Sequence, residues 1–163
     1  MIRAGYEIKD IQLNLVRLFQ ALKTAGIPIS HFSIVEGYPN KEHFTIASPL
    51  LYIEEPIHAG DERRIHGGTC GDQWNVTIGL WDEQETGGIN LIGQAMAYIR
   101  NLIKNRKTLN EITYNINYYG TAYTATNLSA QGIGVRRLQN DRWIDRDDTN
   151  NAFRFEFELV LIT

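Results

Sequence analysis

The sequence predicts an α+β fold in which two amphipathic helices pack on one face of a mainly antiparallel β-sheet. Residues 9–24 and 87–104 repeat apolar side chains at helical spacing, and several other segments alternate apolar with polar residues. The order helix, strands, helix, strands predicts helices on one side of a sheet whose other face is polar. The 163 residues, 43% of them hydrophobic, can bury the core of a single domain spanning 1–163 and exclude a disordered or fibrous chain.

The two predicted helices differ in how much of their circumference is apolar. The first carries one stripe and ends near Gly26, because Ile27 and Pro28 follow as a stop signal. The second has a broad apolar surface. Its members are Ile89, Leu91, Ile92, Ala95, Met96, Tyr98, Ile99, Leu102 and Ile103. That width suggests a helix that packs on a sheet and also contacts something else.

The strands between the two helices are predicted with unequal clarity. Residues 29–36 form a short strand, and 43–55 form an edge strand or two pieces because Pro49 interrupts them. Residues 56–72 are rich in glycine and charge, which predicts a loop or a loosely formed hairpin tip, long enough for a binding role. Residues 73–81 alternate most regularly here and predict a central strand.

After the second helix the pattern again alternates between strands and polar segments. Residues 111–119 predict a strand, and the small polar residues of 120–130 predict a loop. Residues 131–139 predict a strand with glycine breaks, and the polar stretch 140–151 predicts a hairpin connection.

The closing stretch, residues 153–161, has the strongest alternation in the chain. One of its faces consists of Phe153, Phe155, Phe157, Leu159 and Leu161. Burying each such side chain stabilises by about 1.5–3 kcal/mol, so exposing all of them would cost nearly the stability of a whole domain. We therefore expect this strand inside a sheet, with that face under a helix. Arg154, Glu156 and Glu158 on the other face are expected to meet solvent or a polar partner.

Charge and cysteine content argue against several function classes. The formal net charge is −3 and the pI about 5.8, with no basic excess, so we expect no sequence-specific nucleic-acid partner. Cys70 is the single cysteine, which excludes an intramolecular disulfide and fits a reducing compartment. The first ten residues lack the apolar core of a signal peptide, and no apolar run approaches the ~18 residues of a membrane span. We expect a soluble protein made and used in a cytoplasm, with no membrane partner.

Motifs that would support chemistry are weak throughout. His66 and Cys70 have a metal-like spacing, but their segment is glycine-rich and no second pair stands nearby. Gly67–Gly71 lacks the Gly-Lys-Ser/Thr ending of a phosphate loop, and the aspartates of 145–148 lack the other features of a calcium loop. We expect no catalytic, cofactor-binding or metal-ligating residues, and no enzyme. The alternative of a small enzyme or ligand-binding domain would involve His58, His66 and Cys70.

Taken together, the order of elements resembles the tail-terminator (tail-completion) proteins of long-tailed bacteriophages. The resemblance rests on the amphipathic helix leading to Ile27-Pro28, the turn 37–40, the strand WNVTIGLWDE, the second helix and the FxFxFELxL terminus. It covers nearly the whole chain as an order of elements rather than as a diagnostic motif.

The resemblance implies a structural virion protein without catalytic residues. Such proteins form a hexameric ring at the head-proximal end of the tail, terminate tail-tube polymerisation and join the tail to the neck. The implied partners are other copies of the chain, the tail-tube protein, a neck or head-completion protein and, in contractile tails, the sheath protein. The implied location is the tail or neck of a virion assembled in the host cytoplasm. A different neck or head–tail connector subunit is the alternative.

A ring requires two different complementary patches on each subunit. The second helix could supply one, and a sheet edge near Phe44–Ile53 or the closing strand could supply the other by strand pairing. A candidate contact with the tube or neck is the charged segment Asp61, Glu62, Arg63 and Arg64, which suits a solvated loop equally well. Tyr118, Tyr119 and Tyr123 suit an interface, where aromatic residues are enriched, and suit ordinary core and rim equally well.

Overall fold

The computed structural model describes residues 2–23, 28–37, 49–62, 71–83, 88–118, 120–147 and 152–163. Its helices are α1 (Glu7–Lys23), the short 3-10 helix η1 (Pro28–His31), α2 (Gly88–Lys104) and α3 (Arg106–Glu111). Its strands are β1 (Ser33–Glu36), β2 (Leu50–Ile53), β3 (Ile57–Glu62), β4 (Gly71–Glu83), β5 (Tyr114–Tyr118), β6 (Thr121–Thr126), β7 (Gly134–Asp147) and β8 (Ala152–Ile162). Among the helices described, none combines the length and apolar content that crossing a bilayer requires.

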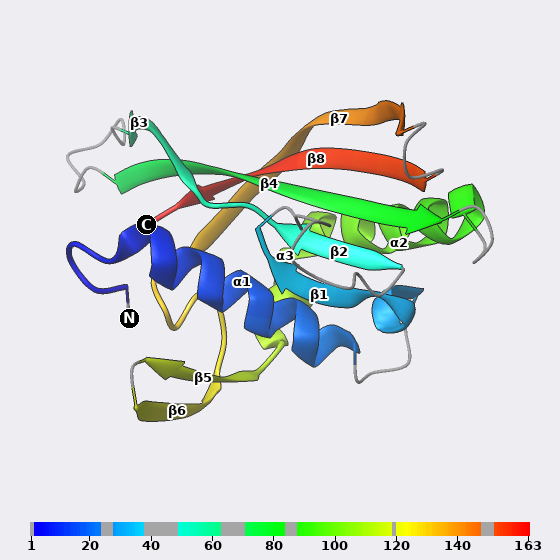
Figure 1. Ribbon diagram of the computed structural model, residues 1–163. Coiled ribbons are helices and arrows are strands. Elements are labelled where there is room, and N and C mark those ends of the chain that lie inside the picture. The colour runs from blue at the N-terminus through cyan, green and yellow to red at the C-terminus, as the bar shows by residue number, and fades with distance from the viewer. Residues whose placement is uncertain are drawn as a thin grey trace.

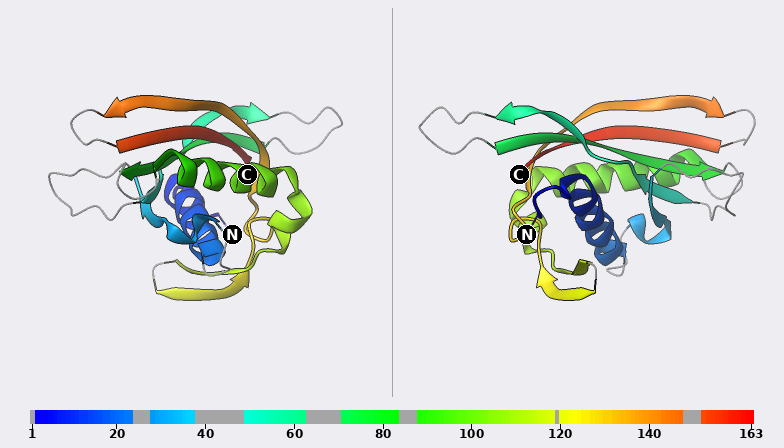
Figure 2. Two further views of the ribbon diagram at one scale, coloured as in Figure 1. Left: turned by 90° about the vertical axis from the view of Figure 1, so that its right-hand side faces the viewer. Right: turned by 60° about the vertical axis from the view of Figure 1, so that its left-hand side comes forward.

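The main sheet has the strand order β1-β2-β4-β8-β7, and β3 pairs with β4 beyond the end of β2. The β1–β2 pair is parallel and the other pairs are antiparallel. Helices α1 and α2 lie on one side of this sheet (Figures 1 and 2). The separate β5–β6 hairpin lies beyond α1, on the side away from the sheet. The predicted α+β class and the placement of the helices are confirmed.

The closing strand β8 occupies the interior position predicted from its alternation. It pairs with β4 on one side and β7 on the other. Phe155, Phe157, Leu159 and Leu161 are buried in the core that the helices share with the sheet. Both helices contribute their apolar stripes to this core, Ile11, Leu15 and Phe19 from α1 and Ile92, Met96 and Ile99 from α2.

Helix α1 is buried on two sides, and this explains its buried polar residues. Asp10 and Asn14 are fully buried although both are polar. Asn14 Oδ1 accepts a hydrogen bond from the Tyr114 hydroxyl at 2.7 Å, and Asn14 Nδ2 donates to the Tyr118 hydroxyl at 2.6 Å. Asp10 forms an ion pair with Arg3. The network fastens the β5–β6 hairpin to α1, since unpaired buried polar groups would be costly.

Several polar segments that were predicted as connections are strands instead. Residues 57–62, predicted to lie within a loop or a loosely formed hairpin tip, form β3 and pair with β4. This pairing is closer to the predicted hairpin tip than to the predicted loop. Residues 63–70 lie outside the described residues. Residues 121–126, predicted as loop, form β6. Residues 140–147, predicted as a polar connection, continue β7. These strands are short, irregular or at an edge, so their hydrophobic pattern is weak.

Two smaller differences concern the type and the boundaries of predicted segments, and a third segment is described only in part. The strand predicted at 29–36 begins with η1, and only its second half is β1. The helix α3, capped by Asn105, precedes β5 where the strand was expected to start at residue 111. The strand predicted over 43–55 is described only as β2, because residues 43–48 lie outside the described residues.

Candidate interaction surfaces

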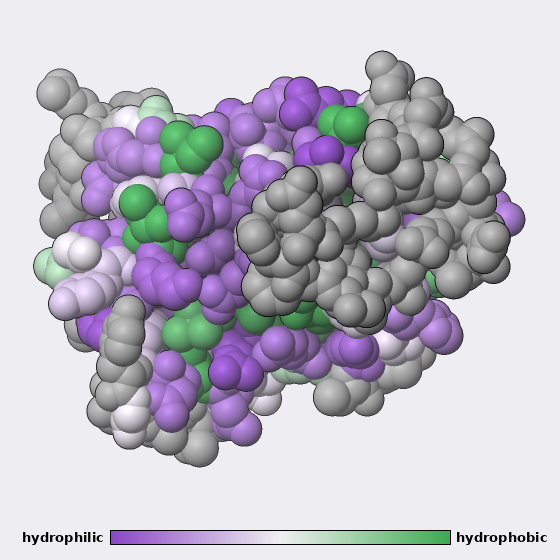
Figure 3. All heavy atoms as spheres, in the orientation of Figure 1, coloured by the Kyte–Doolittle hydropathy of each residue, from purple (hydrophilic) through white to green (hydrophobic). Residues whose placement is uncertain are grey.

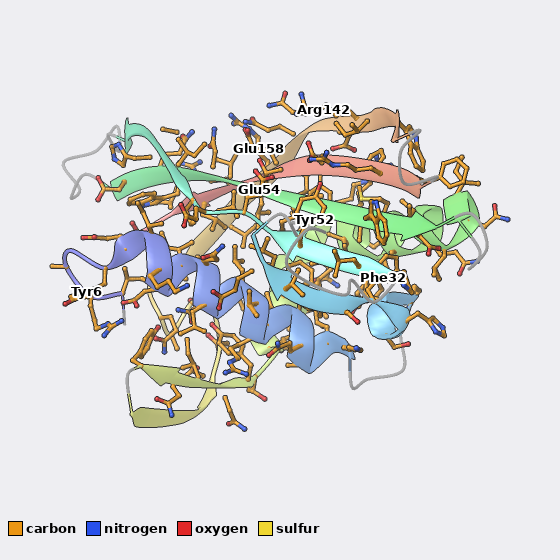
Figure 4. The ribbon with its side chains drawn as sticks, in the orientation of Figure 1. Tyr6, Phe32, Tyr52, Glu54, Arg142 and Glu158 are labelled. Carbon is orange, nitrogen blue, oxygen red and sulfur yellow. The ribbon has the colours of Figure 1, made fainter. Side chains whose placement is uncertain are left out.

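The sheet face opposite the helices carries a row of four paired residues. Tyr52 of β2 is opposite Gly79 of β4, which is opposite Glu156 of β8, which is opposite Arg142 of β7. The Tyr52 ring lies directly over Gly79: a Cβ built there would stand 1.8 Å from Tyr52 Cζ. The missing side chain lets Tyr52, which is labelled on β2 in Figure 4, cross the central strand and reach Glu156.

Glu156 is the centre of a buried charged cluster. The Tyr52 hydroxyl donates to Glu156 Oε1 at 2.6 Å, and Arg154 Nε donates to the Tyr52 hydroxyl at 2.8 Å. Arg154 also pairs with Glu156 Oε1, and Arg142 reaches Glu156 Oε2 at 3.2 Å. Glu156 is 5% exposed, so the expectation that it meets solvent or a partner is wrong. Its charge is buried because two guanidinium groups and a phenol satisfy it.

The electrostatics of this cluster keep Glu156 ionised. Burial by itself would raise the pKa of Glu156, but hydrogen bonds from Tyr52 and Arg154 outweigh it and lower that pKa. Burial, followed by the hydrogen bond to Glu156, raises the pKa of Tyr52. Burial also raises the pKa of Glu54, with added repulsion from Glu156. Both Glu156 oxygens accept bonds within the chain, an arrangement that stabilises the sheet face and is unlike a general acid or base.

A more open polar strip adjoins the cluster. Glu158 is half-buried and accepts from Gln139, with Asn140 Nδ2 at 3.4 Å. Glu158 and Asn140 line a groove across β4, β8 and β7 together with Thr77 and Arg142. In the view of Figure 3 the described surface is mainly hydrophilic, with hydrophobic residues in small separate areas. A polar partner for this face remains a prediction.

The free edges of the main sheet are not where the sequence placed them. Both β2 and β8 have strands on each side, so Leu50–Ile53 and the closing strand are not edges, in agreement with the interior position expected for the closing strand. Residues 44–48 of the predicted edge lie outside the described residues. Within the described part of the chain, the outer strands are β1, β3 and β7. Strand β7 has irregular register at several points and a positive φ of 56° at Asn140, features that disfavour indiscriminate strand pairing.

Among the described residues, large exposed hydrophobic side chains lie at four places, and the start of α1, with Tyr6 and Ile8, is one of them. Ile57 at the start of β3 is 69% exposed, Ile89 at the start of α2 is 50% exposed, and Trp143 on β7 is 48% exposed. Trp143 packs edge-on against Phe155 with ring centroids 5.0 Å apart. Most of the broad apolar surface of α2 is covered by its own chain, and a second contact for this helix remains a prediction.

The predicted charged contact, residues 61–64, is described only in part. The backbone of Asp61 and Glu62 belongs to β3 and pairs with β4. The side chains of these two residues, and all of Arg63 and Arg64, lie outside the described residues. Their role as an interface remains a prediction.

Of the three tyrosines predicted for an interface or for ordinary core and rim, the structure describes the side chain of one. Tyr118 is 6% exposed, and its hydroxyl accepts from Asn14 and donates to Gln131 Oε1 at 3.0 Å, which places it in the core. Tyr119 and the side chain of Tyr123 lie outside the described residues.

The residues considered for chemistry are not assembled in the described part of the chain. His58 is exposed on β3, stacks edge-on with Trp74 at 5.1 Å, and has Nε2 3.4 Å from Asp72 Oδ1. His66 and Cys70 lie outside the described residues. The described residues contain no group of three or more His, Cys, Asp or Glu side chains placed to hold a metal ion.

Comparison with known proteins gives a likeness of fold. No family model matches the sequence, and no curated protein matches it. Among solved structures, the chain is similar to one in the virion of a native gene transfer agent (GTA) particle, with a TM-score of 0.53 and 11% sequence identity. The match covers 98% of this chain and 100% of that chain. At this identity the two chains share a fold.

Proposed function

We propose that this chain is a structural virion protein of a phage-like particle, and more specifically a tail terminator. In this role it forms a ring at the head-proximal end of the tail, stops tail-tube polymerisation and joins the tail to the neck. The observation that supports the proposal most is the end-to-end likeness to a chain of the gene transfer agent virion. It agrees with the resemblance of the sequence to tail terminators, which was drawn from the order of elements.

The physical features of the surface are compatible with assembly. The helices cover one face of the sheet; in the part of the chain that the structure describes, β1, β3 and β7 each have an outer edge with no strand beside it, and a polar strip lies on the other face. The buried cluster around Glu156 holds that face rigid, and a rigid surface loses little entropy on binding. We propose no catalytic role, and replacing His58, His66 and Cys70 together by Ala should leave virion assembly intact.

Deleting the gene from its phage or phage-like element tests the proposal. The expected product is tailless heads together with free tubes of uncontrolled length, and adding the purified protein should cap growing tubes at a uniform length. Normal tails in the deletion strain would contradict the proposal. The alternative, a neck or head–tail connector subunit, is favoured if the deletion yields separate heads and tails of normal length, because the virion likeness is common to both roles.

A further inference from the structure

A basic groove lies where α2 ends beside the outer strand β7. Its described lining includes Arg100, Lys104, Arg136 and Arg137 against a single carboxylate, Asp141, which pairs with Arg100. These four cationic residues are all exposed. Leu138 and Ile103 supply an apolar floor. The groove therefore combines an excess of positive charge with apolar surface.

An acidic groove lies where β1 ends beside α1 and the link between β2 and β3. Its described lining includes Glu36, Glu54 and Glu55 against a single cation, Lys9, whose Nζ is 2.7 Å from Glu36 Oε2. Glu36 and Glu55 are exposed, and Glu54 is half-buried. Burial raises the pKa of Glu54, so a cation brought to this groove would relieve an unfavourable negative charge.

An exposed apolar side chain belongs to the acidic groove. Ile57, which is 69% exposed, lines it. This protruding aliphatic side chain, which is surrounded by charged residues, is complementary to the apolar floor of the basic groove. Interfaces commonly join a small apolar anchor to a charged rim in this way.

The two grooves lie toward opposite edges of the main sheet. Strand β7 ends the strand order on one side, whereas β1 ends it on the other and β3 lies on that same side of β4. Opposite signs on opposite edges allow a head-to-tail contact between copies. A symmetric contact of either groove with itself would bring like charges together, which costs several kcal/mol. Head-to-tail contacts of this kind form a closed ring when the rotation between neighbouring copies divides a full turn, and an open filament when it does not.

We propose that the basic groove of one copy binds the acidic groove of the next copy. The inference rests on the proposed function, because it identifies the surfaces through which the ring would close. The Ile57 side chain of one subunit packs toward Leu138 and Ile103 of its neighbour, and the charged residues around them fix the orientation of the contact.

Charge reversal of the full-length protein tests this pairing. One variant, Lys104→Glu with Arg137→Glu, makes the basic groove acidic, and a second, Glu36→Lys with Glu55→Lys, makes the acidic groove basic. Each alone should raise the protein concentration needed for ring assembly by on the order of 100-fold, since like charges now meet. The matched control, Arg17→Glu with Lys107→Glu, reverses exposed cations outside both grooves and should assemble like the unmodified chain.

Mixing the two variants gives the decisive measurement. Every contact in an alternating ring of the two variants pairs opposite charges again, so equimolar mixing should restore rings seen by light scattering and negative-stain microscopy. Recovery also shows that both variants are folded, and circular dichroism of each alone checks this directly. Tail tubes are added if the unmodified chain assembles only on them.

The outcomes separate the two proposals. The groove pairing is wrong, while the tail-terminator function stands, if the unmodified chain forms rings and each charge-reversal variant alone forms them equally well. The same conclusion follows if the two variants are folded and mixing them restores no rings. If the unmodified chain stays monomeric even with tail tubes, the tail-terminator function and the groove pairing fail together.

Discussion

Replacing Gly79 by Ala should destabilise this protein far more than a single added methyl group ordinarily would. The new Cβ would stand 1.8 Å from Tyr52 Cζ and 2.2 Å from the Tyr52 hydroxyl oxygen. No real Cβ contact is that short, so the ring has to leave its place over β4. The 2.6 Å hydrogen bond from Tyr52 to Glu156 is lost with it.

The magnitude follows from what Tyr52 loses. Its side chain is fully buried, so partial exposure of the ring costs about 1.5–3 kcal/mol. Losing a hydrogen bond to a charged group costs about 1.5–3 kcal/mol more. Replacing a strand glycine by alanine returns about 0.5–1 kcal/mol. The net loss in the free energy of unfolding is therefore about 2–5.5 kcal/mol, which lowers Tm by about 4–22 °C for a chain of this size.

Urea and thermal unfolding of the purified variant measure this loss. Gly134→Ala is the matched control, because Gly134 also lies in a strand but has Ile162 O as its nearest neighbour at an ordinary 3.7 Å. In a Tyr52→Leu background, Gly79→Ala should be nearly neutral, since the ring that it displaces is absent. A Gly79→Ala variant as stable as the unmodified chain, or one equally destabilised in both backgrounds, would refute the reasoning.

Three further perturbations probe other parts of the structure. Tyr52→Phe should cost about 1–2 kcal/mol at pH 7. The pKa of Glu156 is lower in the folded state than its unfolded value of about 4.3. Its interactions therefore stabilise the folded state fully above that unfolded pKa, and this stabilisation is lost as the pH falls through the folded pKa. The difference between Tyr52→Phe and the unmodified chain should therefore narrow in urea unfolding at pH 3, and an unchanged difference would contradict the assignment. Asn14→Ala should cost about 2–4 kcal/mol and reduce amide protection in the β5–β6 hairpin by hydrogen exchange, whereas Asn101→Ala on the exposed side of α2 should do neither. Asn140→Val should cost about 1–2 kcal/mol in thermal unfolding because of the positive φ, while Asn140→Gly should stay within about 0.5 kcal/mol; equal effects would argue against that backbone conformation.

The charged cluster could not be predicted from the sequence because its members are far apart along the chain. Tyr52 and Glu156 are separated by 104 residues and meet through the register of β2, β4 and β8. Local alternation placed Glu156 on the polar face correctly but carried no information on what would cover it. One signal was present: Gly79 interrupts the regular strand 73–81, and glycine inside a strand often marks a close approach by another group.

The sequence by itself determined the elements whose burial is encoded locally. The period of 153–161 required an interior strand, and the stripes of α1 and α2 required a sheet beneath them, because apolar side chains must leave water wherever they recur on one face. Tertiary structure alone decided which strands lie at the edges, why the polar residues of α1 are buried, and how Tyr52 meets Glu156. These features depend on backbone pairing between distant segments, and backbone hydrogen bonds leave little trace in the order of side chains.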